Sequence, residues 1–166
     1  MFSRRRLILS TVFLSGCSPY QGRSSPEQDK ARQVNGSQLE RRLFEAVNAV
    51  RVREGAPKLQ WHAGAAAAAE SHSRAMAQRD FFSHIDPKRG DLPARMKEAG
   101  VHWRLVAENL FEQRGCADAV QCAVDGWFNS PGHKRNLLNT EYTNTGIGIA
   151  SNKRGTVYYT QIFLTP

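Results

Sequence analysis

Apolar residues in the chain fall first into segments with helical spacing and later into segments with the shorter period of strands. Leu39, Leu43, Val47 and Val50 recur every three or four residues, the period of one helix face. The preceding Ser-Gln-Leu-Glu of residues 37–40 matches the capping box that starts many helices. We therefore expect the folded domain to begin here with a helix.

Further helices are indicated by composition and by capping signals. The alanine-rich run over 63–80 consists of the strongest helix former. Aspartates 91 and 118 and the Ser-Pro pair at 130–131 are typical of helix starts. The predicted helices are 63–80, 91–100, one with Val120, Val124 and Trp127 on one face, and one that begins at Ser130-Pro131.

The remaining apolar segments predict strands. Residues 101–111 have the alternating and mixed apolar character of a strand, and the β-rich segments 145–150 and 156–164 flank a turn at 151–155. The expected fold class is therefore α+β, with helices packed on an antiparallel sheet. Four aromatic residues are expected in the core: Trp61, Trp127, Tyr158 and Phe163.

The first 36 residues differ in composition from the rest of the chain. A basic start, residues 1–6, precedes the apolar run 7–14, which is too short to cross a bilayer that needs about 20 residues. We interpret residues 1–16 as a secretory signal, with Sec and twin-arginine export both open. Residues 17–36 are polar and read as a flexible tether, so the domain would span 37–166.

Cys17 ends a Leu-Ser-Gly-Cys segment that resembles a bacterial lipobox. The resemblance implies acylation of Cys17 and cleavage before it, which would place the protein in the cell envelope. It would be lipid-anchored at the periplasmic face of a membrane, the outer membrane in a Gram-negative cell. The alternative is an ordinary cleaved signal with a chance cysteine.

Charge adds little to this picture. The formal net charge is +8, from 23 Lys+Arg against 15 Asp+Glu, but Arg4, Arg5 and Arg6 supply three of these charges. The remaining excess is spread along the chain without a basic block. Nucleic acid is therefore not an expected partner.

Cys116 and Cys122 are two further cysteines in a chain expected to be exported. Cys116 lies just before the helix capped by Asp118, and Cys122 lies near its fourth position. A disulfide that fixes the chain to this helix start fits that placement, and two free buried thiols are the alternative.

Motifs of common enzymes are absent from the sequence. It has no His-Glu-x-x-His, no Cys-x-x-Cys, no phosphate-binding glycine loop and no Gly-x-Ser-x-Gly. The two glycines of Gly146-Ile-Gly148 indicate a strand on which another element packs closely.

Five short motifs in order nevertheless resemble the CAP superfamily of cysteine-rich secretory, antigen 5 and pathogenesis-related 1 proteins, in its short bacterial form. The motifs are Phe82-Ser-His84, Ala107-Glu-Asn-Leu110, Trp127-Phe-Asn-Ser-Pro-Gly-His-Lys-Arg-Asn-Leu-Leu138, Tyr142-Thr-x-x-Gly-Ile-Gly-Ile149 and Tyr159-Thr-Gln-Ile-Phe163. The resemblance as a whole covers essentially Leu39 to Phe163. The resemblance implies an α-β-α sandwich, with a central antiparallel sheet between helices.

The same resemblance implies a cleft with His84, Glu108 and His133. A second glutamate of the eukaryotic pattern corresponds here to Ser130. Two imidazoles and one carboxylate could ligate a divalent metal such as zinc, or could form a hydrogen-bonded cleft that binds a ligand without metal, or could be structural. His133 would lie at the third position of its helix, where the helix dipole disfavours imidazolium.

Three functions remain open at this point. The favoured one is a non-enzymatic envelope lipoprotein that binds a lipid, a wall fragment or a protein partner around His84, Glu108, His133 and Ser130. The second is a metal-assisted hydrolase of peptide or envelope substrates. The third is a structural element between membrane and wall.

Overall fold

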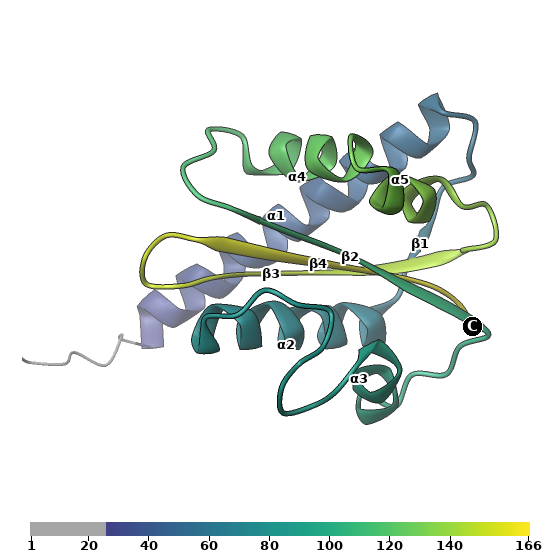
Figure 1. Cartoon of the computed structure of the whole chain (residues 1–166). Helices are drawn as coiled ribbons and strands as arrows, with labels where there is room; N and C mark the ends of the chain where they lie inside the picture. Colours follow the sequence, from purple (N-terminus) through teal and green to yellow (C-terminus); the bar gives the residue numbers. More distant parts are fainter. Residues whose placement is uncertain (1–25) are drawn as a thin grey trace, which may run out of the picture.

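A four-stranded sheet lies between two layers of helices, and Figure 1 shows these three layers. The computed structural model describes residues 26–166, and describes side chains from Gln38 onward. The predicted signal, the predicted lipidation site Cys17 and the start of the predicted tether lie outside these residues. The elements in chain order are α1 Pro26–Arg53, β1 Gln60–Trp61, α2 Ala63–Arg79, α3 Leu92–Glu98, β2 Leu105–Gln113, α4 Ala119–Phe128, α5 Pro131–Leu138, β3 Asn144–Ser151 and β4 Val157–Thr165.

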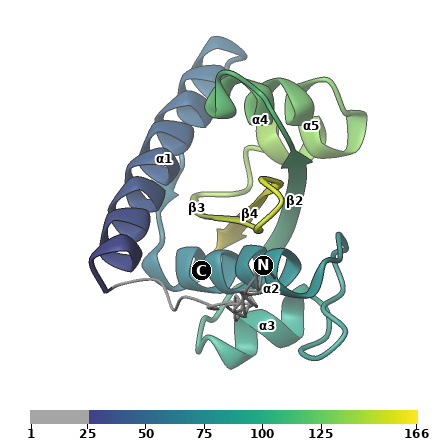
Figure 2. The same cartoon turned by 90° about the vertical axis from the view of Figure 1, so that its left-hand side faces the viewer.

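The strands are arranged in the order β1-β3-β4-β2, so β2 and the short β1 form the two outer positions. β4 pairs antiparallel with both β2 and β3, as expected, whereas the two residues of β1 pair parallel with β3. Helices α1, α4 and α5 cover one face of the sheet, and α2 and α3 cover the other (Figure 2). The α-β-α sandwich is therefore confirmed, with a mixed rather than a purely antiparallel sheet.

The first helix begins earlier than predicted. α1 starts at Pro26 and runs for 28 residues, so residues 26–36 are helical although their composition predicts a flexible tether. Ser37 is inside this helix and does not cap it. The C-terminal half of α1 packs on the core and so provides the helix nucleus. Adding further turns at its N-terminal end does not require the unfavourable nucleation step again, so a polar segment can continue the helix. Its proline at the first position and its many charged and Gln residues are compatible with that.

Most predicted helix starts are confirmed. Asp91 accepts a hydrogen bond from the backbone N–H of Ala94, and Asp118 accepts from those of Val120 and Gln121. Ser130 is the N-cap of α5, but its hydroxyl makes no capping hydrogen bond. The disulfide between Cys116 and Cys122 is also confirmed, and it joins the approach to α4 to the first turn of that helix.

α2 lies directly on β3 because two glycines leave room for its backbone. A Cβ atom at Gly146 would lie 2.1 Å from the backbone nitrogen of Ala66, and one at Gly148 would lie 2.0 Å from that of Glu70. Neither contact is sterically allowed, and a side chain there would force the helix off the sheet. The close packing predicted from the two glycines is therefore confirmed.

No described helix is long and apolar enough to cross a membrane.

Glu40 connects α1 to the outer edge of β3. Its Oε1 accepts a hydrogen bond of 3.1 Å from the backbone N–H of Ile149, beyond the point where β1 has stopped pairing with that strand. The carboxyl group thus takes the place of a strand neighbour. Burial raises the pKa of Glu40 to about 7, although the hydrogen bond from Ile149 acts in the opposite direction.

The raised pKa predicts a pH-dependent stability. The folded state holds the Glu40 proton more tightly than the unfolded state, whose pKa is near 4.5. The native protein should therefore lose stability as the pH rises from 4.5 through about 7. Glu40→Gln, which keeps an oxygen for Ile149, should avoid about 1 kcal/mol of this loss, discounted for partial exposure.

Urea denaturation of both proteins across this pH range measures the difference. Glu45→Gln, on the exposed side of the same helix, is the matched control and should show no comparable trend. A wild-type curve parallel to that of Glu40→Gln would contradict the prediction.

Candidate functional site

Glu108 occupies a buried position on β2, the outer strand opposite β1. Successive side chains of a strand point to opposite faces. Val106 and Leu110 pack against the α2 and α3 side, so Glu108 between them points to the same side, and Asn109 points toward α5. The Glu-Asn pair of this motif therefore reaches both helical layers from one strand.

The Glu108 carboxylate forms an ion pair with Arg95 of α3. Nη2 of Arg95 lies 2.9 Å from Oε1 and 3.1 Å from Oε2 of Glu108. Both side chains are almost fully withdrawn from water, with exposed fractions of 1% and 2%. Leaving either charge unpaired at this depth would be costly, so each residue requires the other.

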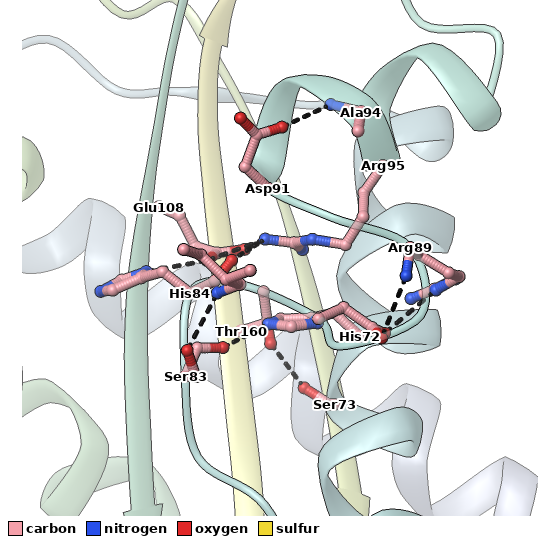
Figure 3. A network of polar contacts seen from close by, with 12 residues as sticks. His72, Ser73, Ser83, His84, Arg89, Asp91, Ala94, Arg95, Glu108 and Thr160 are labelled. Atoms are coloured by element: carbon pink, nitrogen blue, oxygen red, sulfur yellow. Dashed lines mark hydrogen bonds and ion pairs between the residues drawn. The ribbon is translucent and has the colours of Figure 1, made fainter.

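His84 contacts the same carboxylate from the solvent side. Its Nδ1 lies 2.9 Å from Oε2 of Glu108, and 58% of its side chain is exposed. Because an ionised carboxylate can only accept, Nδ1 carries a proton and donates to Glu108. Figure 3 shows Glu108 between the imidazole of His84 and the guanidinium of Arg95.

Two buried contacts hold the backbone around His84. Arg95 Nη2 donates to the His84 carbonyl at 3.0 Å, and Nε2 of the fully buried His72 lies 2.9 Å from the Ser83 carbonyl, to which it donates (Figure 3). Burial, aided by the Arg95 charge, lowers the pKa of His72 to about 4, so this ring stays neutral. His72 is therefore a packed residue of α2.

Asp86 fixes the rest of the loop between α2 and α3. Its buried carboxylate accepts hydrogen bonds from the backbone N–H groups of Lys88 and Arg89 and pairs with the Arg79 and Arg89 side chains. Burial alone would raise the pKa of Asp86, but these hydrogen bonds hold it well below its usual range. The Asp86 carboxylate therefore holds the centre of the loop that carries His84 through hydrogen bonds and ion pairs.

His133 is positioned by its backbone. Asn109 Nδ2 donates to the His133 carbonyl at 3.0 Å, and Asn136 Nδ2 donates to Oδ1 of Asn109 at 2.9 Å. Burial and the nearby His84 lower the pKa of His133, so the neutral ring predicted from the helix dipole is found with a different cause. His84 and His133 thus approach each other at the outer edge of β2, one from each helical layer.

The donor set at this edge does not fit the zinc site considered from the sequence. Glu108 already faces a guanidinium and an imidazole N–H, and Arg95 would lie against any cation bound there. Within residues 26–166, no group of three His, Cys, Asp or Glu side chains is arranged to hold a metal ion. Ser130, the fourth residue predicted here, makes no side-chain hydrogen bond to His84, Glu108 or His133 in that part of the chain.

Sequence reasoning missed Arg95, Asn109 and Asn136. Arg95 lies beside Met96, one turn after Leu92, on the face of α3 that packs in the core. A charged residue on an apolar face is a signal for a buried ion pair. The two asparagines were within the recognised motifs, but nothing in their spacing indicated that they bond to each other.

Comparison with known proteins settles the family. The family model described as CAP, the cysteine-rich secretory protein family, matches residues 44–163. This chain belongs to the CAP family. Its CAP domain resembles a 1.5 Å crystal structure of an extracellular SCP-domain protein from Bacillus anthracis str. Ames, with a TM-score of 0.74 and 32% identity over 88% of this chain and 45% of that one.

Two sequence relatives come from Bacillus subtilis (strain 168). The CAP domain is 36% identical over 125 residues to the uncharacterized membrane protein YlbC, covering 75% of this chain and 34% of YlbC. It is 30% identical over 112 residues to the uncharacterized protein YkwD, covering 68% of this chain and 42% of YkwD. The chain therefore spans less than half the length of either relative.

The buried ion pair gives a direct stability prediction for this CAP domain. Arg95→Met should destabilise the fold by about 3–5 kcal/mol, because it leaves Glu108 as an uncompensated buried charge. Arg95→Met/Glu108→Leu should recover much of that loss, since both charges are gone. Urea denaturation of the single and double variants measures the coupling.

Arg104→Met, at an exposed arginine on the approach to β2, is the control and should change the free energy of unfolding by less than about 0.5 kcal/mol. A double variant at least as unstable as the sum of the two single variants would contradict the pairing.

Proposed function

We propose that the CAP domain binds a ligand at the β2 edge, through His84, His133 and the neighbouring Ser130, and that it does so without catalysis. The observation that carries this proposal is the state of Glu108. Its carboxylate is buried and bonded to both Arg95 and His84. Such a group supports a neighbouring ring, but its Oε2 is taken by His84 and Arg95 and its Oε1 is withdrawn from solvent, so it is poorly placed to take a substrate proton.

In this proposal the exposed residues of the site contact the ligand, and the buried residues hold them in position. His84 is held from behind by Glu108 and is exposed to solvent, and His133 adds a second ring, whose pKa is lowered by burial and by the nearby His84. A rigidly held imidazole pair can accept and donate hydrogen bonds without a change of charge. This favours recognition over the metal-assisted hydrolase, because the zinc ligands that the hydrolase needs are not assembled.

The residues beside His84 favour a ligand with an apolar part. Phe82 and Ile85 are large hydrophobic side chains exposed to solvent on either side of His84 in the sequence. A lipid or an apolar peptide segment could cover them while its polar group meets the imidazoles. We therefore place a lipid or a protein partner ahead of a purely polar wall fragment at this site.

We further propose that the protein is an envelope lipoprotein anchored through Cys17. The signal-like start and the lipobox-like segment support this location. The name of YlbC as a membrane protein and the extracellular origin of the Bacillus anthracis structure agree with it. α1 would lead from the anchor into the CAP domain.

Native mass spectrometry combined with elemental analysis tests the binding proposal. The full chain, purified without chelator, should carry a non-metal adduct that is absent from His84→Ala/His133→Ala. Zinc should remain far below one equivalent in both proteins. His102→Ala, at an exposed histidine before β2, is the control and should keep the adduct.

One equivalent of zinc that is lost only in the double variant would instead support the hydrolase. An adduct retained by that variant would show that the ligand binds elsewhere.

Membrane fractionation tests the anchor. Wild-type protein should sediment with membranes, and Cys17→Ala should move to the soluble fraction because it lacks the acylated thiol. Cys116→Ala/Cys122→Ala, which removes the other two cysteines, should still sediment with membranes. A Cys17→Ala protein that sediments as completely as wild type would contradict lipid anchoring.

A further inference from the structure

A pocket lies at the opposite edge of the sheet from His84. It is lined by Glu40, Arg41 and Phe44 of α1 and by Trp61 of β1, and its volume is about 340 Å³. This volume falls within the range of small-molecule sites, about 300–1,000 Å³. Because β1 and β2 are the two outer strands, the sheet separates this pocket from the site proposed above.

The aromatic wall of the pocket is held rigidly and is partly exposed. Trp61 was expected in the core, but 41% of it is exposed. Its ring packs edge-to-face on Phe44, with centroids 5.5 Å apart. The backbone on either side is fixed to β3 by hydrogen bonds from Gln60 N–H to Thr143 and from His62 N–H to Thr145. The indole is therefore a fixed apolar platform.

The polar wall offers one acceptor and one donor. Glu40 uses Oε1 for the Ile149 N–H, and its second oxygen is an acceptor for another donor when the carboxyl group is ionised, above about pH 7. Arg41, next to it, is exposed and makes no hydrogen bond or ion pair with any side chain from Gln38 onward. The pocket thus combines an aromatic platform with an adjacent acceptor and donor.

We propose that this pocket binds an N-acetylated hexosamine unit of a glycan. The apolar face of the sugar ring would stack on Trp61, and the acetamide methyl group would contact Phe44. The acetamide N–H would donate to Glu40, and its carbonyl would accept from Arg41. The acetamide is the group that matches this acceptor and donor together, and the proposal is independent of the function at His84.

Two other ligand classes match the pocket less well. A cation over Trp61 would face the positive charge of Arg41. An alkyl chain would cover the Glu40 carboxyl group and the Arg41 guanidinium without a partner for either, which costs free energy. A sugar with an acetamide group satisfies both and still uses the aromatic surface.

Titration with two trisaccharides tests the proposal. The probes are the trimer of N-acetylglucosamine and the trimer of glucose, which has hydroxyl groups in place of the acetamides. The full chain should bind the acetylated trimer saturably, with calorimetry and tryptophan fluorescence in agreement. The glucose trimer should bind at least about tenfold more weakly, a difference of about 1.4 kcal/mol.

Variants assign the binding to this pocket. Trp61→Ala should weaken binding of the acetylated trimer at least about tenfold, Arg41→Ala should weaken it several-fold, and Trp61→Phe should be intermediate. His84→Ala should bind like wild type. Equal melting temperatures confirm that the variants are folded, and Arg41→Ala, at an exposed side chain, keeps the test valid if Trp61→Ala is unstable.

Four results would each overturn the proposal. Two concern the wild type: no binding of the acetylated trimer at millimolar concentration, or equal binding of the two trimers. Two concern variants: binding that survives Trp61→Ala, or binding that is lost in His84→Ala. Loss in His84→Ala would assign the sugar to the other site, so the two proposals fail separately.

Discussion

The ion pair between Arg95 and Glu108 is the interaction on which the β2 edge depends. Its two charges are withdrawn from water and come from different elements, α3 and β2. Neither can remain in place unless the loop between α2 and α3 is folded correctly, because that loop leads into the helix that carries Arg95. The pair contributes little net stability in comparison with an apolar pair of similar size. The pair instead determines how the residues at this edge are positioned, because the same guanidinium also holds the backbone of His84.

Side chains protect both outer edges of the sheet, and both candidate sites lie there. At β2, Asn136 donates to the Glu108 carbonyl at 3.5 Å, and at β3, Glu40 accepts from Ile149. Exposed strand edges invite pairing with other chains, and short polar side chains or carboxylates can prevent it. In this domain the protecting groups belong to the same helices, α5 and α1, that line the sites. The residues that protect the edges are therefore neighbours of the residues in the two proposed sites.

Local signals in the sequence predicted the elements whose ends are determined by short-range chemistry. The aspartate caps located α3 and α4, and the turn at 151–155 located the hairpin of β3 and β4. The errors arose where tertiary contacts decide. Val101 was assigned to a strand, but its N–H bonds to the Met96 carbonyl and its side chain packs beside α3, so β2 starts only at Leu105. Trp61 became exposed because β1 is only two residues long.

The candidate site was predictable only in part. The resemblance to the CAP family placed His84 and Glu108 together, and the structure puts them in contact. No local pattern, however, identifies the partner of a buried charge. Arg95 is 13 residues from Glu108 in sequence and reaches it only because α3 packs beside β2.

The glycines at 146 and 148 have a consequence for natural variation in this domain. α2 carries His72, which holds the loop before His84, and the sheet carries Glu108. The absence of a side chain at Gly146 and Gly148 sets the distance between α2 and the sheet, and therefore between His72 and Glu108. In a variant that has alanine at either position and still folds, α2 would be shifted on the sheet, and His72 would be displaced relative to Glu108. Such a variant would be folded but altered at the β2 edge, although neither glycine lies on β2.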